Sequence, residues 1–214
     1  MTTEPGSSTC FLTTENSLVI LLDYQPRTTI AVRSMDSRML MENSLYLASL
    51  TAALEVPVVL STIHKKNSGV LDPEIQVLFP GVASLDRSSR NAWSDPAFLA
   101  AVRKAGRKKL VIAGLLTEIC LCFTVLSALG AGYEVYVVVD ASGGTSDVAH
   151  DAAVQRMVQA GAVPVSVQQV MAEYAESLSS PEKRRALVPI IERYAGGFGQ
   201  MFIFKDYISS GTRD

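Results

Sequence analysis

Segments typical of buried strands alternate with segments typical of helices along most of this chain. "SLVILLD" (17–23) and "VPVVLSTI" (56–63) are short, apolar and rich in β-branched residues, as buried strands are. Between them, "RMLMENSLYLASLTAALE" (38–55) carries apolar residues at helical spacing, without Gly or Pro. Neighbouring parallel strands need long, usually helical crossovers of this kind. The alternation therefore constrains the fold more than any other feature of the sequence.

The same alternation continues to about residue 167. Further strands are expected at 82–87 (weak), 109–114, 133–140 and 162–167, and further helices from Asp95 to about Ala105, from about Thr117 to Leu129, and at 147–161. Strands that alternate with helices of this length indicate a parallel sheet covered on both faces. We predict a Rossmann-like, doubly wound α/β fold with about six mainly parallel strands.

The length of 214 residues fits one domain with a single core. We expect a flexible leader over residues 1–15, the α/β domain over 16–170, and a tail over 171–214 that is first helical and then aromatic. The tail is too short to form a domain of its own.

Charge and hydrophobicity exclude several classes of partner. Nineteen basic and 21 acidic residues give a net charge of -2, and the only basic cluster, Arg103 to Lys109, is short, so we expect no nucleic-acid partner. No segment approaches the roughly 20 apolar residues of a membrane span, and the N-terminus lacks the pattern of a signal peptide. We therefore expect a cytoplasmic protein that does not bind membranes.

Cys10, Cys120 and Cys122 do not form a disulfide framework.

Polar residues that directly follow strands are the first candidates for a functional site. In doubly wound sheets, ligands bind in the crevice beyond the carboxyl ends of the strands. This rule selects Asp23, Arg87, the segment from Gly114 to Cys120, and Asp140.

Cys120 is the candidate nucleophile by position. With Thr117 as the expected N-cap, Cys120 lies in the first turn of a helix, near free backbone N–H groups. The positive end of the helix dipole favours the thiolate, which is the attacking form. The alternative is that Cys120 is a small buried hydrophobe, as unpaired cysteines usually are. Cys122 points about 200° away around the helix, so we assign it to packing.

A nucleophilic cysteine needs a base. His150 falls in the middle of an amphipathic helix, where a structural or surface role is expected. Asp23 is the better candidate if burial raises its pKa, and its alternative role is a capping or turn residue. His64 and His150, the only histidines, are not spaced with other donors as in zinc sites, so we predict no metal.

Four segments together carry a resemblance to a known family. They are "VILLDYQ" (19–25), "RNAWSDPAF" (90–98), "KLVIAGLLTEICLCFTVLSALGAGYEVYVVVDASG" (109–143) and "HDAAVQRMVQAGA" (150–162). The chain resembles the isochorismatase-like cysteine hydrolases, and within them the YcaC-like group, from about residue 16 to 170. The most specific part is G-x-x-T-x-x-C at 114–120 combined with a V-V-x-D-A strand end. The resemblance implies a Rossmann-like sheet and hydrolase activity.

The resemblance implies a catalytic triad of Asp, Lys and Cys. Asp23 matches the general base and Cys120 the nucleophile, but the position of the lysine, four residues before Asn91, holds Arg87. An arginine supplies positive charge without transferring a proton. Arg90 is the second candidate for this role, and the alternative is that both arginines are surface residues of a loop.

The resemblance also implies an oxyanion hole and a cis peptide bond. The bond joins Leu115 to Leu116, and the backbone N–H groups of Leu116 and Cys120 would stabilise a tetrahedral intermediate. Nicotinamidases of the same superfamily carry an Asp-x-His-x-x-His metal site, where this chain has "TIHKKNSG" (62–69) with one His. We therefore expect neither a metal nor another cofactor.

The candidate substrate-binding residues are Gln25, Asn91, Trp93 and Thr117. Candidates for the pocket lining, "DYQPRTT" (23–29), Trp93 and Phe123, suggest a small, partly apolar ligand, although each fits a core or an interface equally well. The expected function is hydrolysis of a small amide or related C–N carbonyl compound through an acyl-cysteine. Isochorismatase activity itself, a vinyl-ether cleavage, needs different recognition of an anionic diacid. The alternative class is a non-catalytic thiol redox sensor or assembly protein, which the exchange of Lys for Arg favours.

The segment "GGFGQMFIFKDYI" (196–208) is too apolar for the surface of a monomer. It holds four large aromatic residues after a pair of glycines, and exposed apolar patches rarely exceed a few hundred Å². It either folds back on its own sheet or contacts a neighbouring subunit. YcaC-like proteins form higher homo-oligomers, so we expect the second arrangement.

Overall fold

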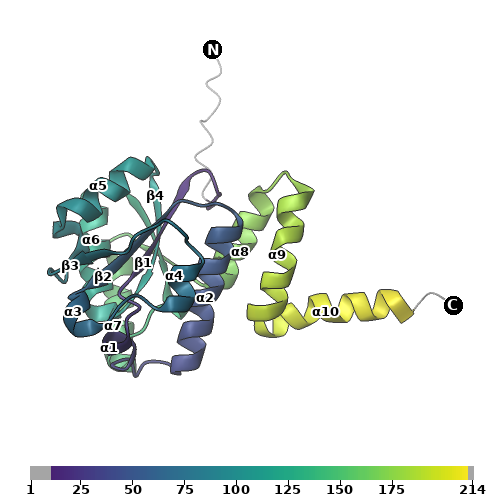
Figure 1. Cartoon of the computed structure of the whole chain (residues 1–214), viewed down its shortest axis with the longest axis horizontal. Coiled ribbons are helices and arrows are strands. Elements are labelled where there is room, and N and C mark those ends of the chain that lie inside the picture. The colour runs from purple at the N-terminus through teal and green to yellow at the C-terminus, as the bar shows by residue number, and fades with distance from the viewer. Residues whose placement is uncertain (1–10, 212–214) are drawn as a thin grey trace, which may run out of the picture.

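The computed structural model describes residues 11–211 and contains one sheet of six parallel strands (Figure 1). The strand order is β3-β2-β1-β4-β5-β6, and every neighbouring pair is parallel. The strands are β1 (Ser17–Leu22), β2 (Val58–Ile63), β3 (Leu85–Arg87), β4 (Lys109–Gly114), β5 (Glu134–Val138) and β6 (Val163–Val165). The predicted doubly wound fold is confirmed.

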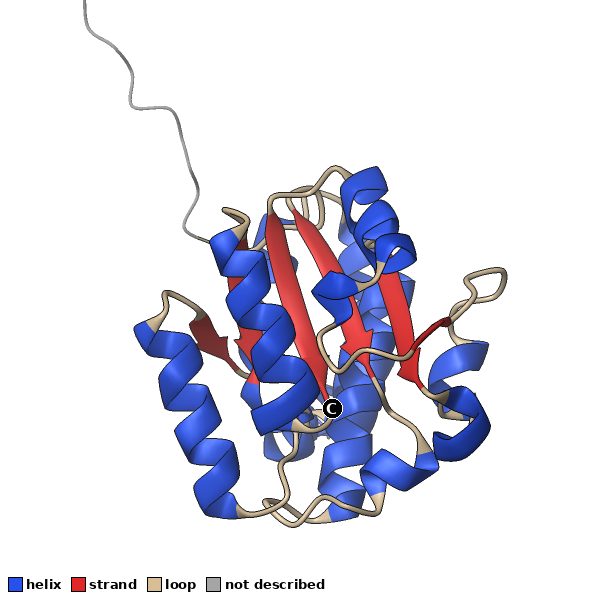
Figure 2. Ribbon diagram, turned by 90° about the vertical axis from the view of Figure 1, so that its left-hand side faces the viewer, coloured by secondary structure: helices blue, strands red, loops and turns tan. Residues whose placement is uncertain are grey.

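Helices cover both faces of the sheet, as Figure 2 shows. One face packs against α2 (Ser37–Ala53), α4 (Pro73–Val77), α8 (Val167–Ser177) and α9 (Pro181–Tyr194). The other packs against α5 (Pro96–Ala105), α6 (Cys122–Gly130) and α7 (Asp147–Gln159). Shorter elements are α1 (Pro26–Thr29), α3 (Lys65–Ser68), the 3₁₀ turns η1 (Ala92–Ser94) and η3 (Val139–Ala141), and the π-helical turn η2 (Thr117–Leu121).

The apolar run of β1 serves both layers of the core. Val19 and Leu21 face the cluster on the α2 side, whereas Leu18, Ile20 and Leu22 face the cluster on the α5 side. All five side chains are fully buried. A strand buried on both faces needs a continuous apolar sequence, which is why this segment does not alternate with polar residues.

The backbones of β1 and β4 approach each other closely at their carboxyl ends. Leu22 pairs with Gly114 in the parallel register, and a Cβ atom added to Gly114 would lie 2.5 Å from the Leu22 Cβ and 2.8 Å from its carbonyl oxygen. Glycine is therefore required at this position by close packing. The contact fixes the carboxyl ends of the two central strands against each other.

Several expected boundaries differ from the structure. The expected domain boundary at residue 170 lies inside α8, whose Met171 and Tyr174 are buried in the core. Leu12 is also buried, and its N–H donates to the Glu173 carboxylate at 2.7 Å. The packed part of the chain therefore begins before residue 16, because α8 offers an apolar surface there. Cys10 lies outside the described residues.

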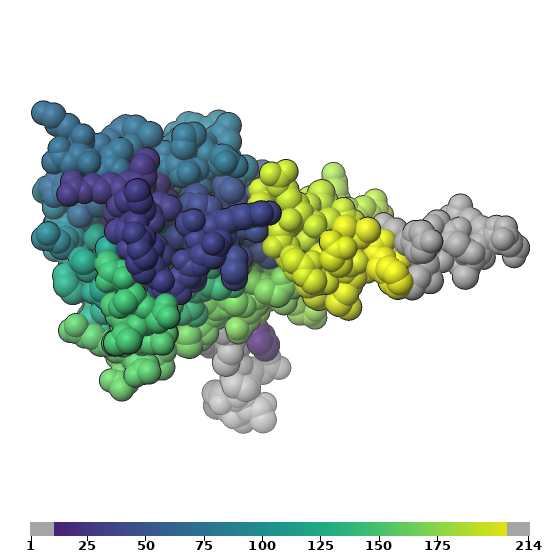
Figure 3. All heavy atoms as spheres, turned by 90° about the horizontal axis from the view of Figure 1, so that it is seen from below, coloured from purple at the N-terminus to yellow at the C-terminus, as the bar shows by residue number. Residues whose placement is uncertain are grey.

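The tail forms α10 (Gly196–Gly211), which packs against α9 and extends away from the sheet domain (Figures 1 and 3). Phe202 packs at the edge of the core, but Met201 is 64% exposed and Phe204 61% exposed. Within the described residues, the tail thus does not fold back over its own sheet. Among residues 11–211, no helix is long and apolar enough to cross a membrane.

The close approach at Gly114 gives a test of the sheet packing. Gly114→Ala should lower the free energy of unfolding by about 1–3 kcal/mol, because the added methyl group overpacks the contact with Leu22. Thermal unfolding at matched protein concentration measures the change. The control is Gly130→Ala, where the added Cβ meets no atom within 4 Å and stability should be unchanged or slightly higher. Equal melting temperatures for the two variants would contradict the packing argument.

Candidate active site

Asp23, Arg87 and Cys120 meet at the carboxyl edge of the sheet. Asp23 directly follows β1, Arg87 is the last residue of β3, and Cys120 lies in η2, after β4. Arg87 Nη2 donates to Asp23 Oδ2 at 2.7 Å, and the two side chains are 1% and 0% exposed. Because β2 separates β1 from β3, the arginine spans two strand spacings, about 10 Å in all. A buried ion pair therefore links an edge strand to the centre of the sheet.

The backbone of Asp23 adopts an uncommon conformation. Its φ of 61° lies in the left-handed region, which is unfavourable for residues other than glycine and is often found at functional sites. The Asp23 N–H donates to the Ser61 carbonyl at 2.9 Å, and the Asp23 carbonyl accepts from the Gln25 N–H at 2.8 Å and from the Thr28 hydroxyl. These bonds hold the carboxylate at the end of β1.

Cys120 is buried rather than activated by its helix. Burial, followed by the charge of Asp23, raises the pKa of the Cys120 thiol to about 12. The expectation of a thiolate is wrong, because burial and the neighbouring Asp23 carboxyl group raise the pKa of the thiol. Thr117 is also not the N-cap. Leu116 precedes the turn, and Thr117 lies inside it.

The carboxyl group of Asp23 has one oxygen that is still available. Burial raises its pKa, although the charge of Arg87 and interactions with the Cys120 thiol oppose the increase. Within the described residues, Oδ1 is buried without a hydrogen-bond partner of good geometry, and Arg87 Nε is in the same condition. Asp23 can therefore accept a proton from the thiol on the side that Arg87 leaves free.

The turn before Cys120 contains the cis peptide bond that the resemblance implies. Leu115–Leu116 is cis, which confirms that expectation. Gly114 N–H donates to the Ser142 hydroxyl at 3.2 Å and Thr117 N–H to the Gly143 carbonyl at 2.9 Å. In the described part of the chain, by contrast, the Leu116 N–H donates no hydrogen bond. It is therefore available to a ligand, and its membership of an oxyanion hole with Cys120 stays a prediction.

Two of the candidate substrate-binding residues make hydrogen bonds inside the protein. The Gln25 amide donates to the Ile63 and Gly69 carbonyls, at 3.2 and 2.6 Å, and accepts from the Ile63 N–H at 2.8 Å. Asn91 caps η1 by accepting from the Trp93 N–H at 3.1 Å and donates to the Ser127 hydroxyl at 2.9 Å. Both side chains thus tie loops around the site to neighbouring elements.

Trp93 and Thr117 are likewise held by neighbours. The Trp93 ring packs edge-on against Phe98 and Tyr133, with ring centroids 6.2 and 5.3 Å apart. Thr117 Oγ1 lies 2.9 Å from His150 Nδ1. A role of any of these residues in substrate binding remains a prediction.

Arg90 is exposed, so of the two arginines it is Arg87 that reaches the site.

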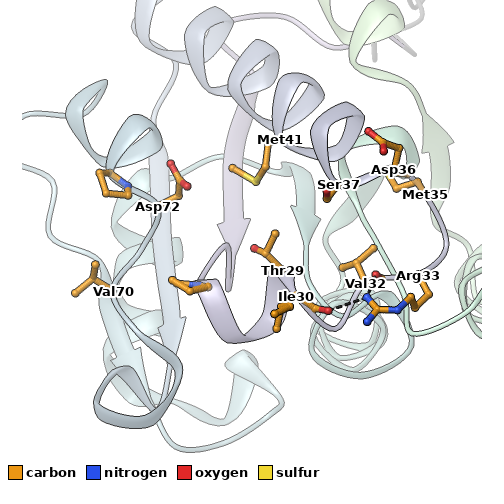
Figure 4. A pocket seen from close by; sticks show the side chains of 12 residues that line it. Thr29, Ile30, Val32, Arg33, Met35, Asp36, Ser37, Met41, Val70 and Asp72 are labelled. Carbon is orange, nitrogen blue, oxygen red and sulfur yellow. Dashed lines mark hydrogen bonds between the residues drawn. The ribbon is translucent and has the colours of Figure 1, made fainter.

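A large hollow lies close to the site but does not contain it. Figure 4 shows this hollow of about 760 Å³ between α1, the first turn of α2 and the segment that carries Val70 and Asp72. Its lining is largely apolar, and Asp36 and Asp72 in it already cap helices. Asp23, Arg87 and Cys120 do not line it. The catalytic candidates are therefore enclosed in the single chain, next to a wide surface hollow.

Sequence reasoning missed a contact between α7 and the turn that carries Cys120. His150, which was expected to be a structural or surface residue, contacts Thr117, 33 positions away in the chain. Neither periodicity nor a local motif indicates such a contact. Among residues 11–211, no group of three or more His, Cys, Asp and Glu side chains is arranged to hold a metal ion.

Comparisons with known proteins identify the family of this chain. Residues 17–169 match the model of the isochorismatase domain family. The probable hydrolase YcaC of Escherichia coli is 36% identical over 149 residues, which cover 69% of this chain and 72% of YcaC. Its crystal structure, described as an octameric hydrolase of unknown specificity, superposes with a TM-score of 0.88 at 29% identity, over 96% of this chain and 100% of that chain.

A second solved structure is similar over the same range. YcaC from Pseudomonas aeruginosa, with hexane-2,5-diol and covalent acrylamide, gives a TM-score of 0.86 at 30% identity over 96% of this chain and 99% of that chain. The family model, the sequence identity and the shared fold lead to one conclusion. The chain belongs to the isochorismatase-like hydrolase family, in its YcaC-like group.

Proposed function

We propose that this protein is a cysteine hydrolase that cleaves a small amide or related C–N carbonyl compound through an acyl-Cys120 intermediate. The observation that carries the proposal is the buried Asp23–Arg87 pair beside the Cys120 thiol, with one carboxylate oxygen left free. A nucleophile, a base and a fixed positive charge are the groups that acyl transfer requires.

The first step forms the acyl-enzyme. At neutral pH the Cys120 thiol is protonated, because its pKa is raised to about 12. Asp23 Oδ1 takes the thiol proton as sulfur bonds to the substrate carbonyl carbon, and the carbonyl π electrons move to oxygen. The N–H groups of Leu116 and Cys120 donate to this oxyanion. The protonated Asp23 then gives its proton to the substrate nitrogen as the C–N bond breaks.

The second step releases the acid. Asp23, again a carboxylate, takes a proton from water as the water oxygen attacks the acyl carbon, and it returns the proton to sulfur as the thioester bond breaks. Arg87 takes part as a hydrogen-bond donor and a positive charge beside Asp23. Its contribution is to orient Asp23 and to offset the negative charge in a buried site.

Two observations support a small substrate. Asp23, Arg87 and Cys120 are 0%, 4% and 5% exposed, so only a compact group can reach the sulfur without a large rearrangement. The YcaC of Pseudomonas aeruginosa was solved with covalent acrylamide, itself a small amide. We therefore propose small primary amides, ureas and hydroxamates as the first compounds to test.

The alternative, a thiol redox sensor, has less support. Redox-sensing cysteines have low pKa values and are accessible to solvent. Here burial raises the pKa of both Cys120 and Cys122, and both side chains are buried.

Cys120 and Asp23 should act as one unit. Cys120→Ser and Asp23→Asn should each lower kcat by at least about 1,000-fold, and the double variant should be little worse than either, because each removes the same proton-transfer step. Ammonia release from a panel of small amides measures the effect. Cys122→Ala is the matched control and should stay within about threefold of the wild type, because Cys122 packs in the core. Full activity in either site variant would exclude the mechanism.

The two arginines should differ strongly. Arg87→Ala should lower kcat by about 100-fold or more, because it removes the charge that fixes the buried carboxylate. Arg90→Ala should change kcat less than about threefold, since Arg90 is exposed. Both variants are assayed with the same substrate, and melting temperatures are compared to detect loss of the fold. The opposite ranking would show that Arg87 does not take the place of the family lysine.

We also propose that the protein is a homo-oligomer in which α10 contacts a neighbouring subunit. Met201 and Phe204 on α10 are 64% and 61% exposed in the single chain, and the ribbon view shows α10 leading away from the sheet (Figure 1). Large exposed apolar side chains that lie together usually mark an interaction surface. The octameric YcaC of Escherichia coli matches 96% of this chain.

Truncation after Tyr194 tests the role of α10. The full-length protein should have an oligomeric mass by light scattering, and the truncated protein should have a smaller one, because the exposed apolar helix is removed. The control is Gln200→Ala, which changes a polar residue of the same helix and should leave the mass unaltered. The proposed contact of α10 with a neighbouring subunit would be refuted by a monomeric full-length protein. It would also be refuted if the truncated protein kept the same number of subunits.

A further inference from the structure

The turn that carries Cys120 is fixed from outside by α7 and by the loop before it. Thr117, the first residue of the turn, is fully buried. Its N–H donates to the Gly143 carbonyl at 2.9 Å, and its hydroxyl shares a hydrogen bond of 2.9 Å with His150 Nδ1. Thr117 is not a capping residue, so its hydroxyl has no role in starting the helix. Its described partner is His150 on α7.

The next residue of the turn is held by the same loop. Glu118 Oε1 accepts from the Thr145 N–H at 3.0 Å and from the Thr145 hydroxyl at 2.6 Å. Glu118 Oε2 is buried and has no hydrogen-bond partner among the described residues. Two consecutive residues of the turn are thus attached to the segment that leads into α7.

Gly144 allows this segment to approach so closely. A Cβ atom added there would lie 2.7 Å from Glu118 Oε2 and 3.1 Å from the Cβ of His150. Its carbonyl accepts from the Arg33 N–H at 2.9 Å, so the loop is also tied to the segment between α1 and α2. The turn, the loop and His150 form one packed unit.

The neutral form of the His150 ring fits its hydrogen bond with the Thr117 hydroxyl. Burial lowers its pKa, whereas the charges of Asp151 and Asp147 on α7 and of Glu118 on the turn oppose the decrease. The imidazole is therefore neutral at neutral pH and can share one hydrogen bond with the Thr117 hydroxyl without carrying a charge into the site.

We propose that His150 is a positioning residue, which acts through Thr117 to hold the Cys120 thiol against Asp23. Its significance for turnover rests on the proposed function, but its effect on the thiol does not. Small displacements of a reacting group have large effects on rate. The raised pKa of Cys120 depends on burial and on the charge of Asp23. Releasing the turn from α7 should therefore impair catalysis. It should also lower the pKa of the Cys120 thiol toward that of a free cysteine.

The experiment measures iodoacetamide alkylation of the full-length protein against pH, with Cys120 and Cys122 resolved by peptide mass mapping. In His150→Ala and in Thr117→Val, Cys120 should react at least about fivefold faster at pH 8, and the midpoint of its pH profile should fall. Cys122 lies in the core on the same helical segment and serves as the internal control, with an unchanged rate. In parallel, kcat for an active amide should fall about tenfold with little change in KM, because the Thr117 hydroxyl and His150 Nδ1 are bonded to each other inside the protein.

Three further variants separate positioning from general stability. His150→Asn places an amide near the position of Nδ1 and should restore both alkylation and kcat to within about threefold of the wild type. The double variant His150→Ala/Thr117→Val should be no worse than either single variant, since both remove the same bond. Gln155→Ala, on the exposed side of α7, should have no effect.

The outcomes are distinct. Unchanged alkylation of Cys120 in both single variants would overturn the proposal, and so would a parallel increase at Cys122, which indicates general loosening. Failure of His150→Asn to restore the profile would also overturn it, because the hydrogen bond would then not be the cause. If no amide is cleaved by the wild type, the proposed function fails, while the alkylation data still decide the role of His150.

Discussion

The site depends on one buried ion pair, between Arg87 at the edge of the sheet and Asp23 at its centre. Bringing two charges out of water is costly, and their attraction compensates only when the geometry is good. The 2.7 Å contact between Arg87 Nη2 and Asp23 Oδ2 meets that requirement, and Arg87 Nη1 also donates to the Ser89 carbonyl at 3.1 Å. Only one carboxylate oxygen is used. The other oxygen, Oδ1, is buried and has no hydrogen-bond partner among the described residues, because the arginine that stabilises the charge approaches from a single side.

The ion pair also explains the state of the cysteine. Burial and the charge of Asp23 raise the pKa of Cys120, while Arg87 opposes the increase. The resting site therefore holds a protonated thiol beside the buried Asp23 carboxyl group, whose pKa burial raises and whose charged form Arg87 stabilises. A pair in this state favours transfer of the proton during attack, with the carboxylate as general base. In the proposed mechanism Asp23 transfers every proton, and Arg87 supplies charge and hydrogen bonds.

Sequence patterns predicted the fold and the place of the site, but not its electrostatics. β1 and β4 were identified because strands buried on both faces must be continuously apolar, and their carboxyl ends located Asp23 and Cys120. The helix dipole suggested a lowered thiol pKa, whereas burial raises it. Burial depends on the packing of residues distant in sequence, which no local pattern contains. The same limit explains why the bond between Thr117 and His150 was missed.

In the proposed mechanism, an arginine can take the place of the lysine that the family resemblance implies, for a geometric reason. The ion pair must cross β2, since β3 and β1 are not neighbours in the sheet. A guanidinium offers several donors in a rigid fork, so one nitrogen can bind the carboxylate while another is anchored at the strand end. Arg87 does this with Nη2 on Asp23 and Nη1 on the Ser89 carbonyl. An ammonium group is a single point of charge and cannot be fixed at both places by separate nitrogens. In the proposed mechanism Arg87 therefore orients the Asp23 carboxylate from a fixed position, and Asp23 performs the proton transfer to and from the thiol.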